Sequence, residues 1–294
     1  MPKAVFSVLD TGSVMHWTMK KTDDDKVKLW GKQMTHICDR CMASTVMGNC
    51  IVIGDNDGKI HLIEVNDEGL TGKHVISKTG LPYPVTAFAF YKEFLISAHE
   101  LASIQVWTAE AETWEMMNRA VINKDEVGLL GISCLCVTNN LLFMGGVGCA
   151  GWNLLDPLVN IIKINDDPIT AMIECAQHAV VASAGGAVMR GHHLQIYNSE
   201  GNLVKVVSFT FPVLKMCLAA TSETIICGHH NGSITTLRCS DCKLFGRTVT
   251  KRFKDKHHNM SALTCSNIAS PNGTELVALG SENGMLQIWA SRKP

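Results

Sequence analysis

The 294-residue sequence is poor in charge and has no long apolar run. Charged residues make up 18% and the formal net charge is −1, which argues against gripping nucleic acid or an anionic membrane. No apolar stretch approaches the roughly 18 residues that span a bilayer, so we expect no membrane insertion. No segment has the pattern of a convincing amphipathic helix. With 46% hydrophobic residues, the chain is nevertheless globular rather than disordered.

Residues 1–13 also lack the long apolar run that is typical of a signal peptide. We therefore expect a cytoplasmic or nuclear protein. Most of the 12 cysteines lie inside apolar stretches, as Cys134, Cys136 and Cys217 do. In a reducing compartment such cysteines behave as small buried hydrophobic residues.

An internal repeat is the strongest signal in the sequence. Each copy has a short apolar strand that ends in small residues, then a turn, then a strand with alternating apolar positions. The seven copies lie near residues 5–17, 51–63, 94–107, 141–155, 180–197, 225–237 and 276–289. Turn glycines such as Gly12, Gly58 and Gly232 supply the positive φ that a tight hairpin needs. The copies recur about every 43 residues, a period typical of repeat folds.

Further strands are predicted on both sides of each hairpin. Mostly apolar segments such as 84–91 and 168–175 precede the hairpins and read as strands buried on both faces. More polar segments such as 203–209 follow and suit an outer position. Four strands in roughly 43 residues describe the blade of a β-propeller.

The repeats resemble the WD40 family along essentially the whole chain. Its third-strand ending is matched by SIQVWTAE and MLQIWAS, and its second-strand turn by IVIGDNDGKI and ALGSENGML. The resemblance implies an all-β, seven-bladed β-propeller of four-stranded antiparallel blades, in a single domain over residues 1–294.

This chain also departs from the WD40 pattern. The Trp-Asp dipeptide is never complete, because Trp17, Trp107 and Trp289 are followed by Thr, Thr and Ala. The Gly-His dipeptide is missing as well. We therefore expect the blade-locking hydrogen-bond network of the family to be largely absent and the fold to depend more on packing.

Closure of the ring is an open question in the sequence. Residues 1–37 offer three strands, and the C-terminus offers three more, so the two ends do not add up to one blade. Either the terminal strands are misjudged, or the ring is incompletely closed. An unpaired edge would accept a strand from a partner.

Loops on one face of such a propeller, the top face in this family, carry most of the histidines. We select as candidate partner-binding residues Tyr83, His99, His192, His193, Phe211, His229, His230, Lys256, His257 and His258. Metal ligation, partner binding and ordinary exposed turns all remain open for these histidines. Because no carboxylate or cysteine is placed by spacing to complete a site, we predict no metal and no cofactor.

Three other motifs receive structural interpretations. The pairs Cys38-x-x-Cys41 and Cys239-x-x-Cys242 fall on opposite faces of a propeller and cannot share one zinc ion. The glycine motif at 146–151 matches G-x-G-x-x-G, but it joins two strands instead of opening a helix, so we interpret it as a hairpin turn.

No catalytic motif stands out, and we predict that the protein is not an enzyme. The resemblance favours a scaffold subunit of a larger assembly that binds protein partners on its top face. One alternative is an enzyme, or a binder of a small ligand or metal, that uses top-face histidines in the central channel. Another is an RNA-associated propeller that uses the basic stretch 247–258, although nucleic acid binding is not our first expectation.

Overall fold

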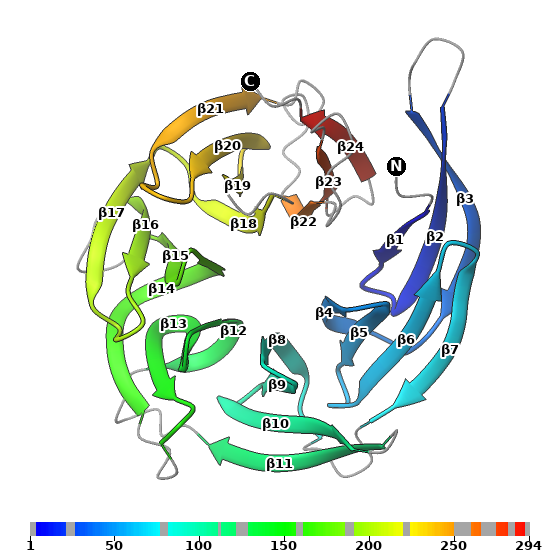
Figure 1. The fold of residues 1–294 in the computed structure, drawn as a ribbon, viewed down its shortest axis with the longest axis horizontal. Coiled ribbons are helices and arrows are strands. Elements are labelled where there is room, and N and C mark those ends of the chain that lie inside the picture. Colours follow the sequence, from blue (N-terminus) through cyan, green and yellow to red (C-terminus); the bar gives the residue numbers. More distant parts are fainter. Residues whose placement is uncertain are drawn as a thin grey trace. The chain divides into compact units, whose positions relative to one another are not determined.

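The structure is a computed structural model of the chain (Figure 1). It describes residues 4–21, 27–76, 82–110, 113–121, 129–156, 161–185, 191–219, 224–249, 260–265, 275–281 and 286–291. Over these ranges the regular elements are β-strands, and no helix has the length and hydropathy to cross a membrane. The chain divides into two compact units, Met1–Ile122 and Asn123–Pro294, and each is described by itself.

The first unit contains three antiparallel sheets with the orders β1-β2-β3, β4-β5-β6-β7 and β11-β10-β9-β8. Its strands are β1 (Ala4–Val8), β2 (Ser13–Lys21), β3 (Val27–His36), β4 (Cys41–Met47), β5 (Cys50–Asp55), β6 (Ile60–Asn66), β7 (Gly69–Val75), β8 (Val85–Tyr91), β9 (Phe94–His99), β10 (Ser103–Glu110) and β11 (Thr113–Val121).

The second unit contains a six-stranded sheet from β12 to β17, a four-stranded sheet from β18 to β21 and a three-stranded sheet from β22 to β24. Its strands are β12 (Leu130–Thr138), β13 (Leu141–Asn153), β14 (Ile161–Cys175), β15 (His178–Ala184), β16 (His192–Tyr197), β17 (Leu203–Phe209), β18 (Val213–Leu218), β19 (Thr224–His229), β20 (Ser233–Arg238), β21 (Leu244–Val249), β22 (Met260–Cys265), β23 (Glu275–Ser281) and β24 (Leu286–Ser291).

Two long strands make the middle of the chain less regular than the repeats suggest. β14 pairs with β13 along its first half and with β15 along its second half, so one strand serves two groups of strands. β13 bends back on itself (Figure 1), because the Leu154 amide donates to the Asn140 carbonyl 2.8 Å away. The glycine motif at 146–151 lies in this bend, where Gly148 has a φ of 102°, and no helix follows it.

The number of blades differs from the prediction. Antiparallel blades are confirmed, but the described strands form six sheets and do not support a count of seven. The difference arises where β14 fuses two strand groups into one sheet. Sheets of three strands stand at the start and the end of the described chain. Whether a partner strand completes either sheet stays a prediction.

Burial along the strands follows their place in each sheet. The second strands, such as β5 and β9, are buried along nearly their whole length. The first strands alternate instead, as β4 and β8 do, because each lies at the edge of its sheet. The expectation that first strands are buried on both faces was therefore wrong, and the apolar core lies around the second and third strands.

Candidate functional site

A buried histidine in the first unit holds the loop that carries Tyr83. His99 ends β9 and pairs in register with Val85 at the start of β8. Its Nδ1–H donates to the Tyr83 carbonyl at 3.2 Å, and the Glu100 amide donates to the Pro84 carbonyl at 2.9 Å. Two hydrogen bonds therefore fix the backbone of Tyr83 and Pro84, while the Tyr83 side chain is half-buried.

The same histidine is tied to the core by a chain of polar groups. Trp107 Nε1–H donates to Ser97 Oγ at 2.9 Å, and Ser97 Oγ lies 3.0 Å from His99 Nε2. With Nδ1 protonated, Nε2 accepts the serine proton, so the donors run in one direction from Trp107 to Tyr83. His99 is 0% exposed and positions a loop, so its selection as a partner-binding side chain was wrong.

The second unit repeats this arrangement around Phe211. The His229 Nδ1–H donates to the Phe211 carbonyl at 3.1 Å, and the Thr235 hydroxyl lies 2.8 Å from Nε2. The His230 amide donates to the Pro212 carbonyl at 3.1 Å. His229 is 2% exposed, so it too is structural and its selection as a contact residue was wrong.

Two exposed side chains and two half-buried histidines lie near this second loop. Phe211 is 36% exposed, and His230 is also exposed. On the neighbouring strands, His192 pairs in register with Phe209, and half-buried His193 places Nδ1 3.2 Å from Ser208 Oγ. We call His192, His193, Phe211 and His230 the Phe211 surface; the structure brings these four candidates to adjoining ends of β16–β19.

Sequence reasoning missed the motif that unites the two loops. Aromatic-Pro-Val stands at 83–85 and again at 211–213, where its valine begins β8 and β18. In each case a histidine ends the next strand along the chain, β9 or β19. The repeated tripeptide was the available signal. The departure of this chain from the usual Trp-Asp and Gly-His dipeptides concealed it.

Buried polar networks are more extensive than expected. Trp17 Nε1–H donates to Ser7 Oγ at 2.9 Å, which repeats the Trp107–Ser97 bond. In the second unit, the Gln195 amide donates to Asp167 Oδ2 at 2.9 Å, and the Tyr197 hydroxyl donates to Gln195 Oε1 at 2.9 Å. The expectation that such networks are largely absent was wrong, because serine, glutamine and tyrosine replace the usual partners.

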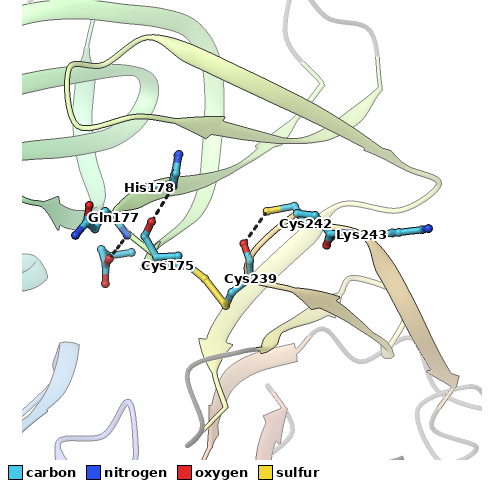
Figure 2. The surroundings of a disulfide bond; sticks show 9 residues. Cys175, Gln177, His178, Cys239, Cys242 and Lys243 are labelled. Carbon is cyan, nitrogen blue, oxygen red and sulfur yellow. Dashed lines mark hydrogen bonds between the residues drawn. A yellow bond between two sulfur atoms is a disulfide. The ribbon is translucent and has the colours of Figure 1, made fainter.

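One of the two Cys-x-x-Cys pairs contributes to a disulfide (Figure 2). Cys239, after β20, is bonded to Cys175 at the end of β14, with 6.1 Å between their Cα atoms. Cys242 stays a thiol, is buried, and points its Sγ toward the Cys239 carbonyl at 3.9 Å. The expectation of reduced cysteines therefore fails for this pair, whereas Cys38 and Cys41 are both free thiols.

The last three selected residues lie outside the described residues. These are Lys256, His257 and His258, together with most of the basic stretch 247–258. Their role in partner or RNA binding stays a prediction.

Comparison with known proteins identifies the fold. No protein-family model matches the sequence, and no curated protein does. The WD40 β-propeller domain of Doa1 superposes with a TM-score of 0.70 at 13% identity, covering 99% of this chain and 90% of that one. A chain in a crystal structure of the mitotic checkpoint complex gives the same TM-score and identity, covering 99% of this chain and 84% of its own length. Identity this low shows the fold alone, and the fold predicted from the repeats is confirmed: this chain folds as a WD40-type β-propeller of antiparallel blades.

Proposed function

We propose that the protein is a non-catalytic interaction scaffold, a subunit of a larger assembly that binds a protein partner through the Phe211 surface. The observation that carries the proposal is an exposed aromatic side chain on a loop whose backbone is held by a hydrogen bond from a buried histidine. Phe211 is 36% exposed while its carbonyl is held by the buried His229.

Such a loop is suited to binding because its backbone is already ordered. An aromatic anchor on a fixed loop buries a large apolar area with little loss of conformational freedom. The exposed His230 adds a donor and an acceptor beside Phe211. One structural neighbour comes from a multiprotein complex, and that precedent favours an assembly subunit over a free-standing protein.

The cytosol or the nucleus is the compartment that we propose for this scaffold. Nine described cysteines are free thiols, which favours a reducing compartment, whereas the Cys175–Cys239 disulfide alone favours an oxidising one. Cell fractionation followed by immunoblotting tests the location, and recovery in a secretory fraction would contradict it.

The function is tested by purifying the tagged protein from its own cells and quantifying co-purified proteins by mass spectrometry. The test variant is Phe211→Ala with His230→Ser, which leaves His229 and the loop bonds in place. The matched control is Trp30→Ala, because Trp30 in β3 is another exposed aromatic residue, at 57%.

We expect a near-stoichiometric protein with the wild type and the Trp30 variant, reduced at least tenfold with the Phe211 variant. A partner that is retained by the Phe211 variant would contradict the proposed surface. If no protein is enriched and RNA is recovered instead, the scaffold proposal fails and the basic stretch 247–258 becomes the site to study.

A further inference from the structure

Three side chains with metal-binding atoms meet in the interior of the first unit. Cys38 lies between β3 and β4, Asp55 ends β5, and His61 lies in β6. One ligand atom from each lies within 4.8 Å of the others. The three residues are 8%, 3% and 5% exposed. The carboxylate and the imidazole are costly to remove from water unless they have partners, and the buried Cys38 thiol places a third metal-binding atom beside them.

Strand pairing brings these residues together from different parts of the sequence. The β4–β5 register places Cys41 opposite Asp55, and the β5–β6 hairpin returns the chain to His61. At the turn, Asp55 Oδ1 accepts the amides of Asp57 and Lys59 at 2.9 and 2.8 Å. Asp55 Oδ2 lies 2.8 Å from His61 Nε2, so the carboxylate is oriented toward the ring.

The His61 ring has one nitrogen that no described protein group satisfies. Its Nε2 is paired with Asp55, whereas Nδ1 is buried without a hydrogen-bond partner. A buried nitrogen without a partner is unfavourable for the fold. Asp55 Oδ2 and His61 Nε2 are both potential ligand atoms, so an ion bound by both would take the place of the proton that they share. The ring would then carry its proton on Nδ1.

The backbone that carries Cys38 is held rigidly. The amides of Ile37 and Cys38 both donate to the Gly12 carbonyl, at 2.9 and 3.3 Å. A Cβ on Gly12 would lie 1.8 Å from the Cys38 carbonyl oxygen, and Gly12 has a φ of +70°, so only glycine allows this approach. The thiol therefore meets the other two groups in a preformed geometry.

A second thiol lies three residues further along the chain. The Cys41 amide donates to the Asp10 carbonyl at 2.9 Å, which ties this end of the segment to the same turn. The Cys41 side chain is half-buried, and its thiol donates to the Ala43 carbonyl at 3.4 Å. Cys41 lies opposite Asp55 in the β4–β5 pairing, and its Cys-x-x-Cys spacing with Cys38 is typical of zinc ligands. Rotation of its side chain would bring a fourth ligand to the cluster.

We propose that Cys38, Asp55 and His61, with Cys41 as the fourth ligand, form a structural zinc site. Mixed sulfur, nitrogen and oxygen ligands favour Zn²⁺ over the hard cations Mg²⁺ and Ca²⁺, which prefer oxygen alone. Each thiol that binds the ion as a thiolate releases one proton to solvent, and no electron is transferred. The bound ion would link the 37–41 segment to the β5–β6 hairpin.

The probe is Zn²⁺ alone, added to the full-length chain after chelator treatment. Metal retained after dialysis is quantified by plasma mass spectrometry, and Co²⁺ replaces zinc for absorption spectroscopy. We expect one zinc per chain and, with Co²⁺, a thiolate-to-metal charge-transfer band with tetrahedral d–d bands. Cys38→Ser and His61→Gln are each expected to weaken binding at least tenfold.

Cys50→Ser is the matched control, because Cys50 is a free thiol in β5 of the same unit and lies outside the cluster. It should bind zinc as the wild type does. If Cys38→Ser retains zinc with unchanged affinity, the ion is held elsewhere and the proposal is wrong. If the site variants do not fold, the Co²⁺ spectrum of the wild type is the test. Absence of a thiolate-to-cobalt band in that spectrum overturns the proposal.

Discussion

The Nδ1 of His229 lies 3.1 Å from the carbonyl oxygen of Phe211, so a fully buried side chain determines the position of an exposed aromatic residue. The same relationship joins His99 to Tyr83 at 3.2 Å. Each histidine is held through its other ring nitrogen by a hydroxyl of the core. The buried histidines therefore hold the backbone of both loops in place.

Replacing His229 with alanine should destabilise the protein more than replacing its neighbour. His229→Ala removes a buried ring and leaves the Phe211 carbonyl and the Thr235 hydroxyl without this partner. We expect a loss of about 2–4 kcal/mol in the free energy of unfolding. His230→Ala, at an exposed position, should change it by less than about 0.5 kcal/mol. Urea denaturation measures both, and equal effects would contradict the structural role of His229.

Ser97 is expected to matter although it is a small residue. Ser97→Ala leaves the Trp107 N–H without its acceptor and His99 without its hydroxyl partner, which should cost about 1–3 kcal/mol. Ser44→Ala in β4 is the control, because Ser44 is exposed. Thermal unfolding followed by circular dichroism compares the two. A wild-type melting temperature for the Ser97 variant would show that the Trp107–Ser97–His99 chain contributes little.

The half-buried thiol of Cys134 and the buried thiol of Cys136, both in β12, should resist alkylation in the folded protein. Burial raises the pKa of Cys134 and of Cys136 to about 12. At pH 8 roughly one in ten thousand of such thiols is ionised, and this fraction grows only as the pH rises toward 12. Iodoacetamide labelling with peptide mapping should find both cysteines unmodified in native protein and fully modified in urea. Rapid native labelling at pH 8 would contradict their burial.

The Cys175–Cys239 disulfide should stabilise the second unit in the oxidised protein. It closes a loop with a sequence separation of 64 residues, so the chain-entropy estimate of its contribution is about 4 kcal/mol. Reduction should lower the free energy of unfolding by an amount of this order in the wild type and leave Cys175→Ser unchanged. Peptide mapping that finds Cys239 linked to Cys242 instead would contradict the pairing.

The architecture of the fold could be predicted because the signals that define it are local. Each hairpin carries its own alternation and turn residues, and Gly12, Gly58 and Gly232 do have positive φ angles of 70°, 81° and 74°. The fusion of sheets at β14 could not be predicted. It depends on strand pairing over 15 residues, which no short motif encodes.

The site was predicted less well, because burial depends on contacts between distant residues. His229 and His230 are neighbours in the sequence, but one is enclosed by Phe211 and Thr235 while the other faces solvent. The cluster of Cys38, Asp55 and His61 could not be predicted from the sequence for the same reason. Its members have no regular spacing and meet through the pairing of β5 with β6 and through the bonds that hold the Cys38 backbone to Gly12.

The central claim, that the protein works as a subunit bound through the Phe211 surface, is tested most directly by its native mass in gently prepared cell extract. The chain itself has a mass of 32.1 kDa. Sedimentation velocity of the fluorescently tagged protein should show a species well above the mass of the tagged chain, and Phe211→Ala with His230→Ser should return it to that of the monomer. Wild-type protein that sediments as a monomer, or a large species unaffected by this variant, would contradict the account.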